Sequence, residues 1–199
     1  MSTPTLIIVS GPPAAGKTTI AKKLSGDLLL PHLSKDIIKE SLFDTLGRSD
    51  RDWSKKVGFA SITLLFKLVD IEMQARRAVI LEGNFKPRID GERFEELRRK
   101  YSPSIVEVYC YATPEVLLSR FRNRATSANR HPGHVENGST SGFQLDELVA
   151  SLSDGTYSPM NQISEVIRVD TTDFAAIDYD GILGTVRSAL AGSPERRES

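Results

Sequence analysis

Short apolar runs alternate with longer stretches of helical periodicity along the chain. Four runs have the length and composition of buried strands, over residues 5–10, 78–82, 105–111 and 165–170. A fifth run, residues 28–33, contains Pro31, which restricts it to the edge or the end of a strand. Helical periodicity covers residues 17–25, 36–46, 55–77, 93–100, 114–124 and 179–191. This alternation predicts an α/β fold with a mostly parallel five-stranded sheet.

Nothing in the sequence divides the chain into separate domains. There is no internal repeat and no linker between the predicted elements, so we expect one domain over residues 1–191, with a disordered tail at 192–199. Residues 136–142 (ENGSTSG) are rich in Gly, Ser and Thr and predict a flexible loop, which could serve as the hinge of a lid over about 118–142.

Composition excludes several classes of protein. The 199 residues carry 26 Lys and Arg against 26 Asp and Glu, and this balance argues against a protein that coats a polyanion. Cys110 is the single cysteine, so there is no intrachain disulfide, and no Cys/His cluster has the spacing of zinc ligands. Without a signal-peptide pattern or an apolar run of membrane-spanning length, we expect a cytoplasmic protein that does not bind membranes.

The strongest motif in the chain is a phosphate-binding loop. Residues Gly11, Pro12, Pro13, Ala14, Ala15, Gly16, Lys17 and Thr18 match GxxxxGK[ST], directly after one predicted strand and directly before a predicted helix. Backbone N–H groups of such a loop surround phosphate oxygens at the positive end of the helix dipole. Lys17 would reach the β- and γ-phosphates and act in catalysis, the Thr18 hydroxyl would ligate Mg²⁺, and Thr19 would complete the nucleotide site. The motif predicts binding of ATP with Mg²⁺.

Asp36 follows the run 28–33, 19 residues after Lys17. The carboxyl ends of parallel strands share one edge of a sheet, so Asp36 is expected beside the phosphate-binding loop. A carboxylate there can accept the proton of an attacking hydroxyl group, as a general base. The alternative is that Asp36 caps a helix beginning at residue 37.

A second acidic residue ends the run 78–82. In Val79–Phe85 (VILEGNF) an apolar strand closes in Glu82, the pattern of a Walker B acid that holds Mg²⁺. Glu82 could equally face the acceptor, or be an ordinary charge at a strand end. Asn84 lies in the turn that follows, where backbone and side chain can approach a ligand.

Arginines cluster between residues 116 and 135, where no acidic residue precedes Glu136. Arg120 and Arg124 are four residues apart and share a helix face, so both could converge on one polyanion and stabilise its charge during transfer. Arg130 and His131 are further candidates for contact with the acceptor. The alternatives are a solvated basic face and a turn around Pro132 with incidental histidines.

The order of these motifs resembles the small P-loop kinases of the AAA-type ATP-binding group, which include chloramphenicol-phosphotransferase-like, zeta-toxin-like and polynucleotide-kinase-like proteins. The similarity extends over residues 6–172. It implies a three-layer P-loop NTPase fold of the nucleoside-kinase type, with a helical lid and an acceptor-site helical insertion at about 37–77.

The resemblance also suggests roles for individual residues. It makes Asp36 the base and places Lys39 where the family often has an arginine that holds the acceptor. Asp170 and Thr171 lie in the segment where related kinases seat the adenine. Within the insertion there is an apolar stripe at helical spacing, most of which we expect in the core; its residues are Leu42, Phe43, Leu46, Trp53, Val57, Ser61, Leu64 and Leu68. Trp53 could stack on a flat acceptor or belong to the core.

The reaction that fits best is ATP-dependent transfer of a phosphoryl group to a hydroxyl of a small molecule, such as an antibiotic, a sugar or a nucleoside. A polynucleotide 5′-hydroxyl kinase is a second hypothesis, although the zero net charge argues against an extended nucleic acid. A regulatory ATPase without an acceptor is a third. We expect a monomer or a homodimer; the sequence does not identify the acceptor.

Overall fold

Five parallel strands lie side by side in the order β2-β3-β1-β4-β5 within the part of the chain that the structure describes. The computed structural model describes residues 3–125, 131–134 and 140–192. The strands are β1 (Thr5–Ser10), β2 (His32–Ser34), β3 (Val79–Glu82), β4 (Ser104–Tyr111) and β5 (Glu165–Asp170). Strands β1, β3 and β4 are covered on both faces, which explains why their sequences are continuous apolar runs.

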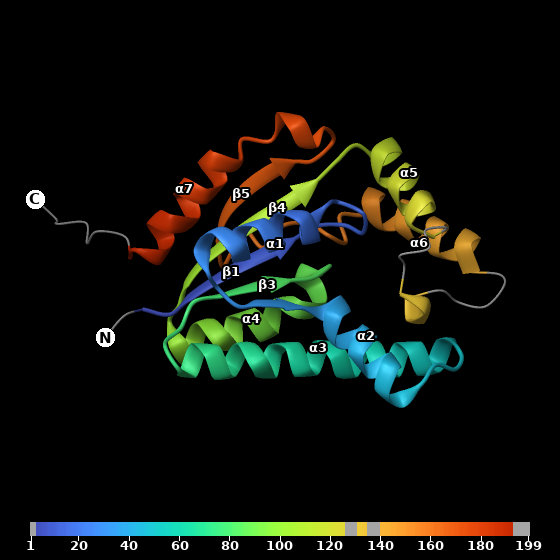
Figure 1. The fold of residues 1–199 in the computed structure, drawn as a ribbon, viewed down its shortest axis with the longest axis horizontal. Helices are drawn as coiled ribbons and strands as arrows, with labels where there is room; N and C mark the ends of the chain where they lie inside the picture. The colour runs from blue at the N-terminus through green and yellow to red at the C-terminus, as the bar shows by residue number, and fades with distance from the viewer. Residues whose placement is uncertain (1–2, 126–130, 135–139, 193–199) are drawn as a thin grey trace, which may run out of the picture.

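Helices cover both faces of the sheet and make the protein three layers thick (Figure 1). They are α1 (Lys17–Leu28), α2 (Lys35–Leu46), α3 (Arg51–Gln74), α4 (Pro87–Tyr101), α5 (Pro114–Ala125), α6 (Thr140–Ser153) and α7 (Tyr179–Leu190), with 3-10 turns at Pro132–His134 and Phe174–Ala176. Helices α3 and α4 lie on one face, and α1 and α7 on the other. None of the described helices has both the length and the apolar character to span a bilayer.

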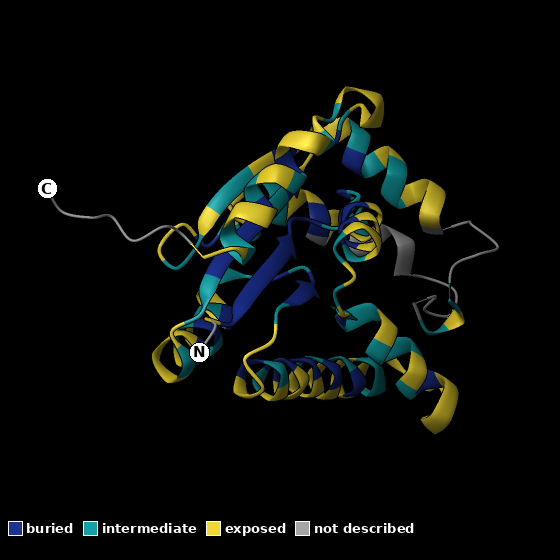
Figure 2. Ribbon diagram, turned by 60° about the vertical axis from the view of Figure 1, so that its left-hand side comes forward, coloured by how far each residue is buried: buried dark blue, intermediate teal, exposed yellow. Residues whose placement is uncertain are grey.

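Side chains of β1 divide between the two layers because successive residues of a strand point to opposite faces. Ile7 and Val9 pack with α1 and α7, whereas Leu6 and Ile8 pack with α3 and α4. On the second face Phe66, Phe85 and Phe94 meet edge to face, and the central strands are almost entirely buried (Figure 2). Phe85 directly follows the turn after β3, so this aromatic cluster fixes the turn that carries Asn84.

Strand order changes direction beside β1. The chain goes from β1 to β2 and β3 on one side, then crosses to β4 and β5 on the other. In open α/β sheets ligands bind at the carboxyl ends of the strands where this change occurs. The segments that follow β1, β2 and β3 place the phosphate-binding loop, Asp36 in the first turn of α2, and Asn84 at that edge.

The structure corrects some sequence-based boundaries and confirms others. Strand β2 lies at the edge of the sheet, as Pro31 predicts, but it begins only at His32. Helix α4 begins at Pro87 rather than at residue 93, because proline suits the first position of a helix. Residues 140–142, expected in a loop, belong to α6; the rest of the predicted hinge and the tail from 193 lie outside the described residues.

The apolar stripe predicted along residues 53–68 is buried only in part. Val57 and Ser61 are buried, whereas Leu64 and Leu68 are 45% and 40% exposed. The buried face of α3 continues instead through Leu65, Val69 and Met73, which pack against β1 and β3.

Candidate active site

The loop between β1 and α1 has the backbone conformation that its glycines predict. Gly11 has φ +132°, and a Cβ atom there would lie 2.0 Å from the Cys110 carbonyl oxygen. Gly16 has φ +74°, and its Cβ would overlap the Phe174 ring at 2.3 Å. Ala14 also has a positive φ, 65°. Glycine is therefore required at two places where the loop passes close to β4 and to the segment after β5.

Lys17 is held inside this loop. Its side-chain nitrogen donates a hydrogen bond to the Pro12 carbonyl at 2.6 Å, and the residue is only 7% exposed. Burial lowers the pKa of the Lys17 ammonium to about 8, against the opposing effect of the Glu82 carboxylate. An anionic phosphate in the loop would restore the charged form, because an opposite charge nearby favours ionisation.

The Cys110 thiol lies behind the loop and is unreactive in this fold. Burial raises the pKa of Cys110 to about 12, so the thiol stays protonated at neutral pH. Because the thiolate is the nucleophilic form of cysteine, Cys110 is a packing residue, not a catalytic one.

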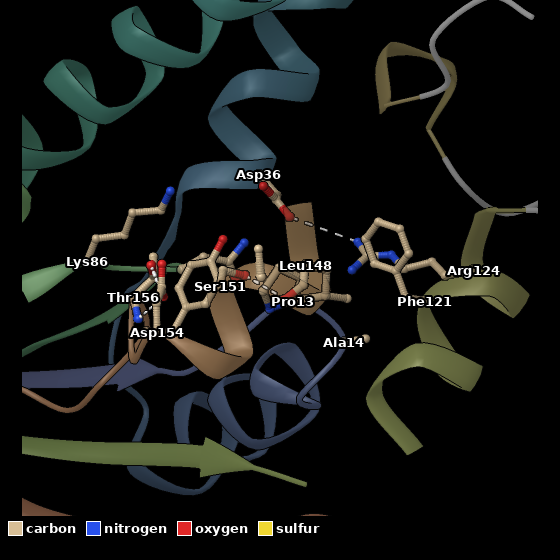
Figure 3. A pocket seen from close by; sticks show the side chains of 13 residues that line it. Pro13, Ala14, Asp36, Lys86, Phe121, Arg124, Leu148, Ser151, Asp154 and Thr156 are labelled. Carbon is tan, nitrogen blue, oxygen red and sulfur yellow. Dashed lines mark hydrogen bonds and ion pairs between the residues drawn. The ribbon is translucent and has the colours of Figure 1, made fainter. Parts of the chain in front are cut away.

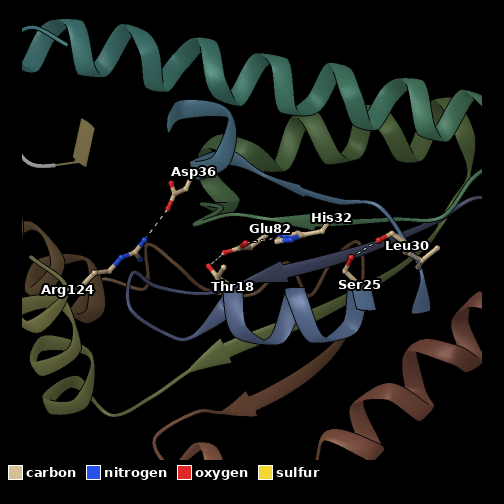
Figure 4. A network of polar contacts seen from close by, with 7 residues as sticks. All are labelled: Thr18, Ser25, Leu30, His32, Asp36, Glu82 and Arg124. Carbon is tan, nitrogen blue, oxygen red and sulfur yellow. Dashed lines mark hydrogen bonds and ion pairs between the residues drawn. The ribbon is translucent and has the colours of Figure 1, made fainter. Parts of the chain in front are cut away.

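Glu82 connects α1, β2 and β3 at the carboxyl edge of the sheet (Figure 4). One carboxylate oxygen accepts a hydrogen bond from the Thr18 hydroxyl at 2.6 Å, and the other accepts one from His32 Nε2 at 2.9 Å. Burial alone would raise the pKa of Glu82, but the bonds from His32 and Thr18, together with the charge of Lys17, lower it below its ordinary value. Glu82 is therefore ionised at neutral pH, and its carboxylate can bind a cation.

This pair of oxygen groups fits a magnesium ion. Thr18 and Glu82 supply a hydroxyl and an ionised carboxylate, the hard ligands that Mg²⁺ prefers. No group of three or more His, Cys, Asp or Glu residues placed to hold a metal occurs among the described residues. That agrees with Mg²⁺ in kinases, which takes one or two protein groups and completes its shell with phosphate oxygens and water.

Asp36 lies in the first turn of α2, one residue inside the helix. The N-cap position belongs to Ser34, so capping does not account for Asp36. Its carboxylate lies 3.9 Å from the guanidinium of Arg124, and the two side chains are 44% and 53% exposed. An ion pair this open contributes little free energy, about 0–1 kcal/mol, so a bound ligand can separate the two groups.

A cavity of about 510 Å³ brings the phosphate-binding loop and Asp36 together (Figure 3). Its lining comes from five places in the chain: the loop, α2, the segment after β3, α5, and the region from α6 to residue 157. The lining residues are Pro13, Ala14, Asp36, Asn84, Lys86, Phe121, Arg124, Leu148, Ala150, Ser151, Asp154, Thr156 and Tyr157. This volume suits a small molecule placed between the loop and the carboxylate.

Arg120 and Arg124 contact different partners in the structure. Its guanidinium donates to the Thr171 carbonyl oxygen at 2.7 Å and lies 4.8 Å from the centre of the Phe174 ring. The Thr171 hydroxyl is in turn 3.1 Å from the carbonyl oxygen of Ala15. Arg120 therefore links α5 to the segment after β5, and Thr171 links that segment to the phosphate-binding loop.

The remaining candidates from the sequence lie at several distances from this cavity. Lys39 donates to Ser54 at 3.2 Å, Trp53 Nε1 donates to the Gly47 carbonyl at 3.1 Å, and His131 contacts Asp44 at 3.0 Å. None of the three lines the cavity beside Asp36. Asp170 is exposed and accepts a bond from the Thr172 amide, Thr19 is exposed on α1, and Arg130 lies outside the described residues.

Sequence reasoning missed His32, Lys86 and Tyr157. The position of His32 depends on the pairing of β2 with β3: His32 pairs with Ile80, two residues before Glu82. Lys86 lies shortly after the end of β3, and ligands commonly bind at such strand ends, so its position was a usable signal. Tyr157 had no local signal, since it reaches the cavity only through the path of the chain after α6.

Comparison with known proteins agrees with this geometry. The profile of the AAA domain family matches residues 6–144. Shikimate kinase of Enterococcus faecalis is 32% identical over 137 residues, which cover 67% of this chain and 73% of that protein. Adenylate kinase of Thermosipho melanesiensis is 27% identical over 130 residues, 62% of this chain and 61% of that protein.

A solved structure is similar over nearly the full length of the chain. The crystal structure of a protein from Chloroflexus aurantiacus, with a provisional assignment as a kinase, has a TM-score of 0.84 and 37% identity, and the match covers 94% of this chain and 99% of that one.

Proposed function

The chain belongs to the AAA domain family and is an ATP-dependent kinase of the P-loop type, and from this premise we propose that it phosphorylates a hydroxyl group of a small molecule, with Asp36 as the general base. One observation carries the proposal: Asp36 lines the same cavity as Pro13 and Ala14 of the phosphate-binding loop. The cavity leaves space for an acceptor between the carboxylate and the site of the γ-phosphate.

The transfer is a direct displacement. Asp36 accepts the proton of the acceptor hydroxyl while that oxygen forms a bond to the γ-phosphorus, and the bond from the γ-phosphorus to the bridging oxygen of ADP breaks. Lys17 stabilises the negative charge that collects on the β- and γ-phosphate oxygens. Thr18 and Glu82 would hold Mg²⁺, and the bound ion would neutralise phosphate charge.

Arg124 has two partners in this scheme. In the structure it faces Asp36 across 3.9 Å, and phosphate oxygens in the loop would compete for the same guanidinium. Arginine makes stronger, bidentate bonds to a phosphate, so nucleotide binding would draw Arg124 away and leave Asp36 free to accept a proton.

A regulatory ATPase without its own acceptor fits less well. Such a protein has no need for a carboxylate facing a cavity of about 510 Å³ beside the phosphate-binding loop. A polynucleotide acceptor remains a distinct hypothesis, because one terminal nucleotide could enter the same cavity.

The test is a screen for phosphoryl transfer. We would incubate the protein with Mg–ATP and a panel of sugars, nucleosides, antibiotics and 5′-hydroxyl oligonucleotides, and follow each acceptor by mass spectrometry. The proposal predicts that a small alcohol gains one phosphoryl group. Steady ATP hydrolysis that no small alcohol accelerates would contradict it.

A further inference from the structure

A second cavity, of about 680 Å³, adjoins the one beside Asp36. The two share Asn84 and Lys86 in their linings, so this pair of residues forms a common wall. The second cavity lies between the N-terminal parts of α2, α3 and α4, and its lining includes no residue of the phosphate-binding loop. A molecule with its hydroxyl at Asp36 would extend into it.

The lining of the second cavity is strongly basic. Its five cationic side chains are Lys35, Lys39, Arg51, Lys55 and Lys86, against the single acidic side chain of Asp90. Asp90 accepts a hydrogen bond from the Lys86 backbone amide at 2.9 Å, so its carboxylate is engaged with the start of α4. Lys55 also pairs with Asp52 at 3.6 Å, but both side chains are exposed to solvent, so this ion pair is weak.

Helix dipoles add to this positive charge. Helices α2, α3 and α4 begin at Lys35, Arg51 and Pro87, and residues of all three first turns line the cavity. The first turn of a helix carries a partial positive charge, which Asp36, Asp52 and Asp90 in these three turns offset in part. The excess of five cationic side chains over one carboxylate in the cavity lining therefore makes the larger contribution in favour of an anion.

Asn84 supplies an independent sign of a ligand at the common wall. Its side-chain oxygen is buried and has no hydrogen-bond partner among the described residues. A buried polar atom left without a partner is unfavourable, so such atoms usually meet a ligand or water. A hydroxyl group of the acceptor could donate to this oxygen.

We propose that the acceptor is a small alcohol that carries an oxyanion, either a phosphate or a carboxylate. Its reactive hydroxyl lies at Asp36, a further hydroxyl meets Asn84, and its anionic group is bound in the second cavity. This inference rests on the proposed function, because it names the substrate class of the same site. It also explains why Lys39, which does not line the cavity beside Asp36, belongs to acceptor recognition.

Binding of matched neutral and anionic alcohols tests the charge requirement. With Mg–AMP-PNP filling the phosphate-binding loop, we would titrate ribose against ribose 5-phosphate, and glucose against gluconate. Trp53, the only tryptophan, lies between Arg51 and Ser54 and reports binding by its fluorescence. We expect at least one anionic partner to bind ten times or more tightly than its neutral counterpart, and the two pairs separate phosphate from carboxylate.

Substitution of cationic residues that line the second cavity tests whether the anionic group binds there. Lys55→Gln and the double variant Arg51→Gln/Lys55→Gln should each weaken binding of that anionic alcohol, the double variant tenfold or more. Lys56→Gln is the matched control, since Lys56 is exposed on the same turn of α3 and does not line the cavity. Equal binding of neutral and anionic partners, absence of binding by all of them, or an unchanged affinity in the double variant would overturn the inference.

Transfer measured on the same pairs separates this inference from the proposed function. Charge-dependent binding that the variants weaken, without phosphoryl transfer to any alcohol, would support the anion site and contradict the kinase acceptor reaction. Transfer to neutral and anionic partners at equal kcat/KM would leave the reaction intact and overturn the anion site. Tenfold preference for a 5′-hydroxyl oligonucleotide over every small anion would overturn the assignment to a small molecule.

Discussion

His32 positions the Glu82 carboxylate, the group that we propose as a holder of Mg²⁺. Glu82 is ionised, so the His32 Nε2 must carry the proton in their 2.9 Å hydrogen bond. The Thr18 hydroxyl holds the other oxygen at 2.6 Å, and together the two bonds fix the plane of the carboxylate. Groups that orient a metal ligand from behind influence affinity for the metal without touching it.

His32→Phe removes this hydrogen bond and keeps a ring of similar size. We expect the Mg²⁺ concentration for half-maximal nucleotide binding to rise about 10- to 100-fold, the range seen when such supporting groups are lost. A fluorescent ATP analogue titrated with Mg²⁺ measures this shift. His32→Gln retains an N–H donor and should recover much of the affinity; equal Mg²⁺ dependence in wild type and His32→Phe would refute the positioning role.

Individual site residues differ in how far the sequence predicts them. The phosphate-binding loop is contiguous, so its residues could be identified from spacing alone. Glu82 ends one apolar run and Asp36 closely follows another, so the rule for parallel strand ends places both at one edge. His32 has no such signal, because its role depends on the register in which Ser34 pairs with Glu82.

Glu107 fastens the segment between α6 and β5 to the centre of the sheet. It is fully buried on β4 and accepts hydrogen bonds from Ser10 Oγ at 2.5 Å and from the Met160 amide at 2.6 Å. The segment it anchors begins with Asp154, Thr156 and Tyr157, which line the cavity beside Asp36. Burial raises the pKa of Glu107 above its ordinary value despite these bonds.

The raised pKa predicts how stability depends on pH. Between the ordinary and the raised pKa the folded protein binds a proton at Glu107 that the unfolded chain does not, so this residue's contribution to stability is present at low pH and is lost as pH rises through the raised pKa. Glu107→Gln removes the titration and should itself cost about 1 kcal/mol or less, because its oxygen can accept from the Met160 amide while its NH₂ group donates to the Ser10 hydroxyl.

Urea unfolding of both proteins across acidic and neutral pH measures this effect. The advantage of wild type over Glu107→Gln in free energy of unfolding should be largest at the acidic end and should decrease with rising pH. A difference that stays constant with pH, or that grows as pH rises, would show that Glu107 does not titrate in the predicted direction.

Among the helices and strands, those marked by a local sequence pattern were predicted, and at least one that lacks a clear start signal was not. Strands β1 and β5 have the predicted limits because an apolar run with polar flanks defines each of them. Helix α6 was not predicted, since its first residues, Thr140 to Gly142, have the composition of a loop. Leu148 of this helix is buried and lines the cavity. Tertiary packing at the site therefore contributes to the position of α6.

The whole molecule is neutral, with 26 basic and 26 acidic residues, yet its charges are unevenly placed. Cationic side chains gather at the first turns of α2, α3 and α4, whereas acidic Glu82 and Asp36 face the phosphate-binding loop. Net charge predicts solubility and nonspecific association, but binding of a small anion depends on the local field of a cavity. Composition alone could not have predicted the basic cavity, because it forms from segments about 50 residues apart in the sequence.

Three elements bring the proposed base, the phosphate-binding loop and an arginine to one cavity. Asp36 comes from α2, Pro13 and Ala14 from the loop after β1, and Arg124 from α5. Each group has a separate role, so loss of the base should impair chemistry while the nucleotide still binds.

Asp36→Asn tests this claim most directly, with kcat for phosphoryl transfer and Kd for Mg–ATP measured on the same preparation. Asp180→Asn, an exposed change of the same kind on α7, is the control. We predict that kcat falls by about 10²- to 10⁴-fold in Asp36→Asn, the usual contribution of a general base, while Kd for Mg–ATP does not weaken. Transfer by Asp36→Asn at the rate of wild type would contradict the account.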